Sequence, residues 1–194
     1  MNDTKAKIFS VMYNLMAEQG YEKTSTNQIC ELAGIKKPTL YYYFKNKEDL
    51  LIEFIKYYLL GDVNKPTLKN IIKTKEQVIE YTYNMGSTAI SFTNSNPLQK
   101  QVLAEIRILE KRMPSVKETT ALLIKEFRKE FLELIELAKE LGAINKKLDT
   151  HTICILIETI FEGIDSTILY YSDETSELEL IKAWEQFVEL LMEK

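Results

Sequence analysis

Apolar residues recur at intervals of three and four positions along most of this chain, and no other feature restricts its fold as strongly. In one stretch they are Ile153, Ile157, Ile160, Phe161, Ile164 and Ile168, and in the next they are Leu180, Trp184, Phe187, Val188 and Leu191. One face of an α-helix repeats about every 3.6 residues, whereas a half-buried strand alternates every two, so this spacing predicts amphipathic helices. No strand pattern stands beside it, and we expect an all-α fold.

Glycine and proline divide the helical patterns. Only 6 glycines and 4 prolines occur in 194 residues, fewer than a turn-rich β fold requires. Glycines follow four of the patterns, where a left-handed helix end favours them, at Gly20, Gly34, Gly61 and Gly142. Prolines begin three others, at Pro38, Pro97 and Pro114. The nine helices predicted in this way cover about 4–19, 25–33, 37–44, 47–60, 74–94, 96–112, 114–141, 149–172 and 175–193. Asp149 and Thr175 are the expected N-caps of the last two.

Charge and composition divide the chain into two parts. The stretch 61–73 is polar and is the one credible break between helical patterns. Residues 1–60 carry eight lysines and seven acids, whereas residues 61–194 carry 17 basic and 22 acidic side chains. The net charge of −4 therefore belongs to the second part, and it does not argue against nucleic acid binding by the first. We expect a head domain at 1–60 and a larger body domain at 61–194.

The sequence argues against several classes of protein. The N-terminus lacks the apolar core of a signal peptide, and no stretch reaches the roughly 18 apolar residues of a membrane helix, so we expect a cytoplasmic protein without membrane contact. Cys30 and Cys154 lie inside apolar helical patterns and are expected to be small buried hydrophobes. His151 is the only histidine and lies far from any cysteine cluster, so we expect no metal and no cofactor. No phosphate-binding loop or nucleophile motif is present, and we expect no enzyme.

The segment 24–51 carries the pattern of two short crossed helices. Ser25 and Gln28 have the spacing of a capping box, and an apolar stripe follows at Ile29, Leu32 and Ala33. Gly34 permits a tight turn, Ile35 fills the corner, and Pro38 begins a second helix in which Leu40 and Phe44 face inward. This arrangement is that of a helix-turn-helix, whose second helix enters the major groove.

The outward face of the second helix suits DNA. Its exposed side chains are expected to be Lys37, Thr39, Tyr41, Tyr42 and Tyr43. Lysines bind phosphate, and threonine and tyrosine contact thymine methyl groups and the backbone. The alternative is an aromatic core patch in an ordinary helical hairpin. Three consecutive tyrosines span about 200° of a helix, however, so at least one is exposed. The chemistry alone leaves DNA binding and a purely structural hairpin both open.

The same segment strongly resembles the tetracycline-repressor-like (TetR) regulators over residues 8–51. The matching elements are Gly20-Tyr21, Thr24-Ser25, Ile29-Cys30, Ala33-Gly34, Thr39-Leu40-Tyr41, Phe44 and Lys47-Glu48-Asp49-Leu50. The resemblance implies a DNA-binding transcription regulator, a repressor that binds a palindromic operator in double-stranded DNA and is released by a small-molecule effector. It implies a three-helix head and a variable helical body that dimerises through its last two helices. A helical protein-binding adaptor without DNA binding is the alternative.

The resemblance also assigns roles to residues of the head. Side chains expected at the DNA are Ser25, Thr26, Asn27, Lys36, Lys37, Pro38, Thr39, Tyr41, Tyr42, Tyr43 and Lys47. Lys47 is expected to hold a phosphate at the start of the fourth helix. Lys36 departs from the family pattern, in which a capping serine is common, so the recognition helix is expected to lack that cap. Val11-Met12 replace a pair of small residues and imply a repacked core.

The body has no motif of its own, but it holds many aromatic residues. The candidate ligand-pocket residues are Tyr57, Tyr58, Tyr81, Met85, Phe92, Phe127, Phe131, Glu158 and Phe161; an ordinary core is the alternative. Glycines within predicted helices, Gly86 and Gly163, indicate either close helix packing or space for a ligand. Glu158, Glu162 and Asp165 form an acidic stripe along an apolar helix. The stripe is either a solvated face or part of a site, so the expected effector is a small apolar or cationic molecule.

Overall fold

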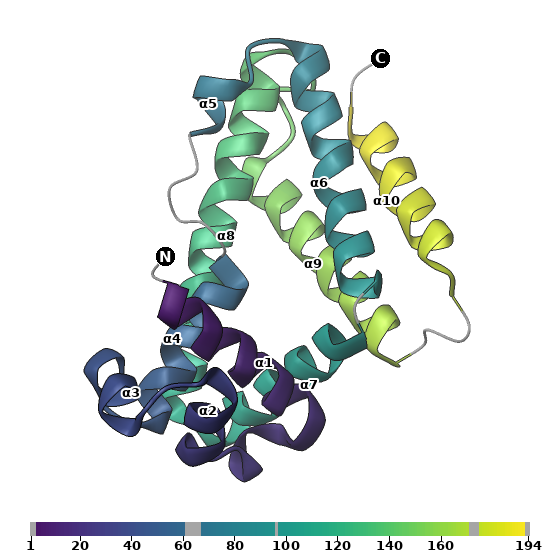
Figure 1. Cartoon of the computed structure of the whole chain (residues 1–194). Coiled ribbons are helices and arrows are strands. Elements are labelled where there is room, and N and C mark those ends of the chain that lie inside the picture. Colours follow the sequence, from purple (N-terminus) through teal and green to yellow (C-terminus); the bar gives the residue numbers. More distant parts are fainter. Residues whose placement is uncertain (1–2, 61–66, 96, 171–174, 193–194) are drawn as a thin grey trace. The chain divides into compact units, whose positions relative to one another are not determined.

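The computed structural model describes residues 3–60, 67–95, 97–170 and 175–192 (Figure 1). In these ranges the secondary structure consists of helices, so the all-α prediction is confirmed. The helices are α1 (Asp3–Lys23), α2 (Thr26–Ala33), α3 (Lys37–Tyr43), α4 (Lys47–Leu60), α5 (Leu68–Ile71), α6 (Lys75–Ser95), α7 (Pro97–Arg112), α8 (Pro114–Glu140), α9 (Thr150–Tyr170) and α10 (Glu177–Leu191). Within the same ranges, no helix combines the length and apolar character needed to cross a bilayer.

The chain forms two compact units. Unit 1 comprises residues 1–63 and 97–123, and unit 2 comprises residues 64–96 and 124–194. Unit 1 thus contains the predicted head together with α7 and the first part of α8. The assignment of DNA binding to 1–60 and of ligand binding and dimerisation to 61–194 stays a prediction.

The core of unit 1 is built on α1. Its side chains Ile8, Met12 and Met16 are almost fully buried, at the four-residue spacing of one helix face. They belong to one apolar cluster with Ile29 of α2 and Val102 of α7. The helix contacts both α2 and α7. The short helices α2 and α3 are therefore carried on a packed scaffold.

The core of unit 2 is centred on Trp184 of α10. Its indole is fully buried and tilts against the Phe161 ring of α9, with ring centroids 5.0 Å apart. The indole Nε1 donates to the backbone carbonyls of Thr82 and Tyr83 on α6 at 3.1 and 3.2 Å. Helix α6 contacts both α9 and α10. Because α6 also lines a cavity, this packing fixes one wall of the candidate ligand site.

Some details of the helices differ from the predictions. Helix α1 continues to Lys23 through a kink at Gly20, whose φ is 77°. The short α5 lies in the stretch that was predicted to be a break. Thr175 is not the N-cap of α10; Ser176 is, and its side chain accepts from the Glu179 amide. Gly61 and the predicted helix ends at 172 and 193 lie outside the described residues.

Candidate nucleic-acid interface and ligand cavity

Helix α2 begins and ends as its sequence predicts. The Ser25 hydroxyl accepts from the Gln28 amide at 3.2 Å, and the Gln28 side chain accepts from the Ser25 amide at 2.9 Å, so the capping box is confirmed. Gly34 ends the helix in the left-handed region with a φ of 66°. One core prediction is wrong, because the Leu32 side chain is 63% exposed. The buried residues of α2 are instead Ile29 and Cys30, and Leu32 faces solvent.

Helix α3 buries two residues and presents the rest. Leu40 and Phe44 are each 1% exposed, which holds the helix on the core of unit 1. Tyr41 and Tyr42 are 48% and 82% exposed. The exposed residues at its start are Lys36, Lys37 and Pro38, and Thr39 is half-buried. Lys36 makes no side-chain cap hydrogen bond, as expected for its departure from the family pattern.

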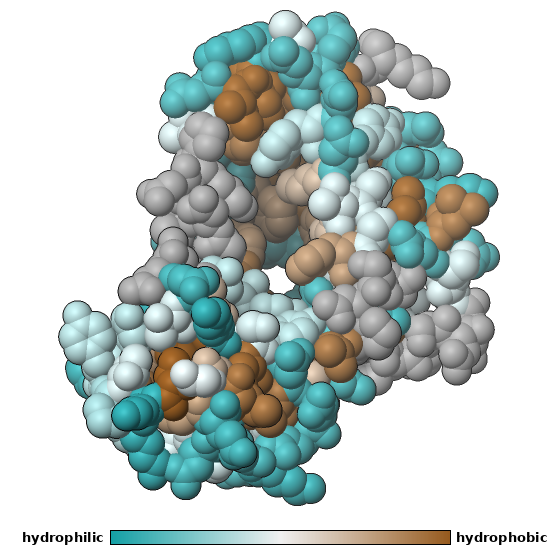
Figure 2. All heavy atoms as spheres, in the orientation of Figure 1, coloured by the Kyte–Doolittle hydropathy of each residue, from teal (hydrophilic) through white to brown (hydrophobic). Residues whose placement is uncertain are grey.

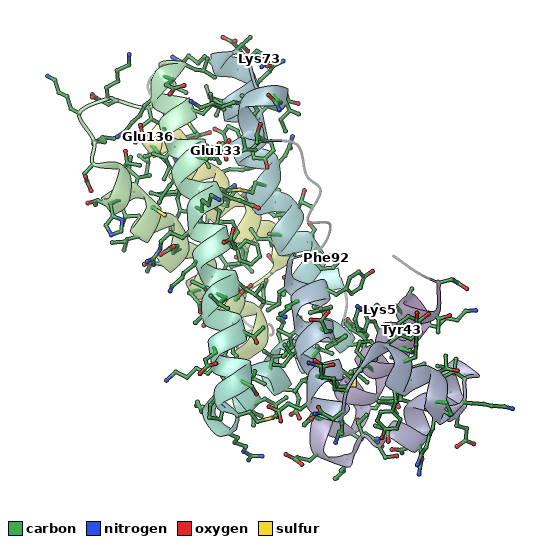
Figure 3. All side chains as sticks on the ribbon, turned by 90° about the vertical axis from the view of Figure 1, so that its left-hand side faces the viewer. Lys5, Tyr43, Lys73, Phe92, Glu133 and Glu136 are labelled. Atoms are coloured by element: carbon green, nitrogen blue, oxygen red, sulfur yellow. The ribbon has the colours of Figure 1, made fainter. Side chains whose placement is uncertain are left out.

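Tyr43 does not belong to the outward face. It is half-buried and packs against the core cluster of unit 1, so its predicted position outside is wrong. Its ring meets the Tyr42 ring edge-on, with centroids 5.0 Å apart. In Figure 3 it lies near Lys5, whose Nζ is 5.5 Å from the centroid of the Phe44 ring. Tyr43 sits one position before Phe44, so the turn that buries Phe44 also brings Tyr43 partly inward.

Lys47, the predicted phosphate ligand, lies at the corner between α1 and α2. Its Nζ is 4.1 Å from the centroid of the Tyr21 ring and donates to the Glu22 carbonyl at 3.4 Å. Partial burial lowers the pKa of Lys47, and the negative charge of Glu22 opposes this shift. Burial, with smaller contributions from Glu48 and Glu22, raises the pKa of Tyr21 to about 12, so this ring stays neutral. The lysine is held by an aromatic face and a carbonyl.

The other predicted DNA residues surround this corner. Ser25 and Asn27 at the start of α2 are exposed, and Thr26 is half-buried. Sequence reasoning missed Glu105 of α7, whose Oε1 accepts from the Tyr21 amide at 2.7 Å. The two residues are far apart in sequence, and no local pattern indicates that they meet.

Unit 2 contains a cavity of about 490 Å³. Three helices line it, and the lining residues are Tyr81, Met85, Ala89, Ile124, Phe127, Glu130, Phe131, Glu158, Phe161, Glu162 and Asp165. Figure 2 shows apolar side chains along the hollow between α6 and α8. The rings of Phe131 and Phe161 are stacked, with centroids 5.8 Å apart and planes 12° apart. A volume of this size with aromatic walls suits a small organic ligand.

Six of the nine candidate pocket residues line this cavity, namely Tyr81, Met85, Phe127, Phe131, Glu158 and Phe161. Tyr57 and Tyr58 belong to unit 1, where Tyr57 stacks on Phe9 and Tyr58 stacks on Phe54. Phe92 is 60% exposed and lines a separate hollow with Ser91. The pattern of aromatic residues could not separate these environments, and a ligand role for the three stays a prediction.

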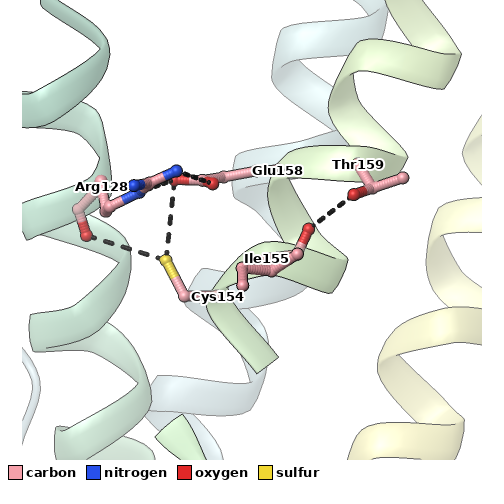
Figure 4. A network of polar contacts seen from close by, with 5 residues as sticks. All are labelled: Arg128, Cys154, Ile155, Glu158 and Thr159. Atoms are coloured by element: carbon pink, nitrogen blue, oxygen red, sulfur yellow. Dashed lines mark hydrogen bonds and ion pairs between the residues drawn. The ribbon is translucent and has the colours of Figure 1, made fainter. Parts of the chain in front are cut away.

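The acidic stripe of α9 contributes all three of its carboxylates to the cavity lining. Glu158 is already paired, because Nε and a terminal nitrogen of Arg128 donate to its two oxygens at 2.7 and 2.6 Å (Figure 4). These hydrogen bonds lower the pKa of Glu158 against the opposing effect of burial. The buried Cys154 lies beside the pair, 3.8 Å from Glu158 Oε1. Sequence reasoning missed Arg128, which reaches Glu158 from α8.

Relatives of this chain are regulators. The family described as bacterial regulatory proteins, tetR family, matches residues 8–54. An uncharacterised HTH-type transcriptional regulator of Bacillus subtilis, YerO, is 37% identical over 71 residues, which are 37% of this chain and 24% of that protein. Another from the same organism, YuxN, is 28% identical over 162 residues, which are 82% of this chain and 53% of that protein. The chain thus spans about half or less of the length of these relatives.

The fold is shared over the whole chain. A putative transcriptional regulator from Saccharomonospora viridis, solved in complex with choline, superposes with a TM-score of 0.75 at 14% identity and covers 100% of both chains. This likeness concerns the fold, whereas the match at residues 8–54 includes the capping box of α2, the glycine turn and the buried Leu40 and Phe44 described above. Taken together, these findings show that residues 8–54 match the tetR family of bacterial regulatory proteins, and that the chain shares the fold of the choline-bound protein.

Proposed function

We propose that this protein is a DNA-binding transcription regulator, a repressor that reads operator DNA with α3. The observation that carries the proposal is the division of α3 into two faces. Leu40 and Phe44 anchor it in the core, while Tyr41 and Tyr42 extend into solvent next to two exposed lysines. Tyrosine rings can contact bases and lysines can contact phosphates in a major groove. A regulator of this kind acts where the bacterial chromosome is, in the cytoplasm.

The proposed assembly is a homodimer through α9 and α10, bound to a palindromic site. One recognition helix reads only a few base pairs, which is too little for tight specific binding. Apolar side chains on the two helices support the proposed interface, because Ile155, Leu156, Leu178 and Leu190 are 46%, 48%, 59% and 80% exposed. Gly163 of α9 has open space around it, so a helix of a second copy could approach closely there. Two heads one DNA turn apart, about 34 Å, match a palindrome.

The proposed effector is a small organic cation with apolar or aromatic groups, bound in the cavity of unit 2. Four of the residues that line the cavity are acids, and none is lysine or arginine. The Arg128 guanidinium is engaged by Glu158, which leaves the lining acidic overall. Aromatic rings such as Phe131 and Phe161 add cation–π attraction. The choline held by the protein of similar fold is itself a cation. Ligand binding then favours a head spacing that no longer fits two major grooves.

Binding to DNA is tested first. DNA fragments recovered with the purified protein from a sheared genome should share a palindrome, and binding to it should weaken steeply with salt. Sedimentation at micromolar concentration should give a dimer. If the recovered fragments share no sequence, and if any binding to duplexes does not depend on salt, the protein would instead be a protein-binding adaptor.

The effector is tested by thermal shift. Lipophilic cations should raise the melting temperature more than neutral or anionic analogues of the same shape. Glu158→Gln and Glu162→Gln should each reduce that shift, because each removes one negative charge from the cavity lining. If fatty acyl anions stabilise best, or if both variants keep the full shift, the cation proposal fails while the DNA proposal stands.

A further inference from the structure

The carboxylate of Glu105 binds the backbone at the corner between α1 and α2, where the proposed DNA contacts lie. It lies on α7 and is half-buried. Its Oε1 accepts a hydrogen bond from the Tyr21 amide at 2.7 Å, a length typical of a charge-assisted bond. A Cβ on the preceding Gly20 would lie 3.1 Å from the same oxygen, so the carboxylate fits closely against the kink of α1. The kink itself has a φ of 77°, which glycine adopts readily.

The segment that Glu105 holds also holds Lys47. The ring of Tyr21 lies under the Lys47 ammonium, at 4.1 Å from centroid to Nζ. The carbonyl of the next residue, Glu22, accepts from the same ammonium at 3.4 Å. Thr24, which precedes the cap of α2, bonds the Gly20 carbonyl through its hydroxyl at 2.9 Å. One carboxylate therefore fixes a turn whose ring and carbonyl together determine where the lysine ammonium can lie.

We propose that Glu105 is a positioning residue for DNA binding, acting through Tyr21 on the phosphate contact of Lys47. This inference rests on the proposed DNA-binding function. The change in DNA affinity that it predicts for loss of the Glu105 carboxylate is opposite in sign to the change expected from net charge alone. Removing an acid from a DNA-binding unit raises its positive charge, and attraction to the phosphate backbone alone would then tighten binding. Loss of the Glu105 carboxylate should instead weaken binding, because Lys47 loses its fixed place.

The experiment measures operator affinity against salt for the full chain. Glu105→Ala should bind about tenfold more weakly and lower the salt slope by about one, as loss of one phosphate contact does. Glu105→Gln should restore most of the affinity, because its amide oxygen can accept the same bond from Tyr21. Glu110→Ala, the same charge change on the same helix, should bind as well as the unmodified protein or better. In a Lys47→Met background, Glu105→Ala should not lower the slope further.

Other outcomes overturn the inference. Wild-type or tighter binding by Glu105→Ala would do so, as would a loss in Glu105→Gln equal to that in Glu105→Ala. A further drop of the slope in the Lys47→Met background would show that the two residues act separately. If Glu105→Ala does not fold, Glu105→Asp, whose carboxylate is one methylene shorter, gives the same comparison. Failure of the unmodified protein to bind any duplex would refute the proposed function instead, so the two failures are distinguishable.

Discussion

A Cβ atom on Gly86 would lie 2.2 Å from Cε2 of the Trp184 indole. The indole is fully buried and is fixed by its hydrogen bonds to two carbonyls of α6. Gly86 therefore lets the backbone of α6 lie directly against the largest side chain of unit 2. Of the two explanations for this helical glycine, close packing is confirmed. Gly163 differs, because nothing lies within 4 Å of a Cβ placed there.

Gly86→Ala should destabilise the protein. Overpacking costs about 1–3 kcal/mol, and the better helix propensity of alanine returns about 1 kcal/mol, so we expect a net loss of up to about 2 kcal/mol in urea unfolding. Gly163→Ala is the matched control and should gain up to about 1 kcal/mol in a protein held monomeric by dilution. An unchanged stability of Gly86→Ala would mean that the indole can move aside. A loss for Gly163→Ala that grows with protein concentration would indicate a partner helix at that position.

The cap of α10 distinguishes two adjacent residues. Ser176→Ala should cost about 1 kcal/mol in the free energy of unfolding, since it removes the acceptor for the Glu179 amide. Thr175→Ala should change stability by much less, because Thr175 lies outside the capping box. Chemical unfolding of the two variants side by side measures the difference. Equal losses would contradict the capping geometry.

Sequence patterns predict those features of the fold that depend on residues close together in the chain. The helix-turn-helix follows from a capping box, a glycine turn and two buried apolar residues, all within 20 positions of one another. The same kind of signal exists for α10, where Ser176 and Glu179 have the spacing of a capping box, and this spacing identifies Ser176 rather than Thr175 as the cap. Leu32 fits the helical period and is nevertheless exposed, because the neighbouring Cys30 fills the buried face.

Contacts between distant helices could not be predicted in this way. Arg128 meets Glu158, and Glu105 meets the Tyr21 amide, across separations that no periodicity connects. A charge on the outer face of a helix and a charge that bonds a neighbouring helix look the same in sequence. The acidic stripe of α9 illustrates this, since its spacing is compatible both with a solvated face and with part of a ligand site. The contact between Glu158 of this stripe and Arg128 of α8 follows from the folded structure and not from the spacing.

Arg128→Met should increase the affinity of the cavity for a cation. The substitution removes the guanidinium that occupies Glu158 and leaves one more carboxylate available to a ligand. The ion pair is partly exposed and therefore weak, so we expect the affinity for the cation to rise by no more than about fivefold. Isothermal titration with a lipophilic cation measures this, and Lys129→Met, which removes a charge from the adjacent position of α8, is the control. Equal or weaker binding by Arg128→Met would argue against a cation beside Glu158.

The same pair makes stability depend on acid pH. The Arg128 guanidinium holds the pKa of Glu158 below its ordinary value. A lowered pKa stabilises the fold above the unfolded value, about 4.3, and this stabilisation is lost as pH falls through the folded value. The unmodified protein should therefore lose slightly more stability than Arg128→Met between pH 6 and pH 3, and the difference should be small because the pair is partly exposed. Urea unfolding at each pH measures the free energy of unfolding of both proteins. If this free energy falls equally with pH in both, the ion pair is not formed in solution.

The exposed tyrosines and Lys47 should contribute to DNA binding in different ways. Tyr41 and Tyr42 extend from α3, so Tyr41→Ala and Tyr42→Ala should cost about 1–3 kcal/mol on the palindrome and reduce the preference for particular bases. Lys47→Ala should weaken binding to all sequences alike and lower the salt slope by about one. Tyr43→Phe is the control, because this half-buried ring keeps its packing when only the hydroxyl is lost. Affinities for the palindrome and for a scrambled duplex at several salt concentrations separate the two effects. If Tyr41→Ala and Lys47→Ala both bind the palindrome as the unmodified protein does, α3 is not the recognition helix, and the surface that meets DNA lies elsewhere on the molecule.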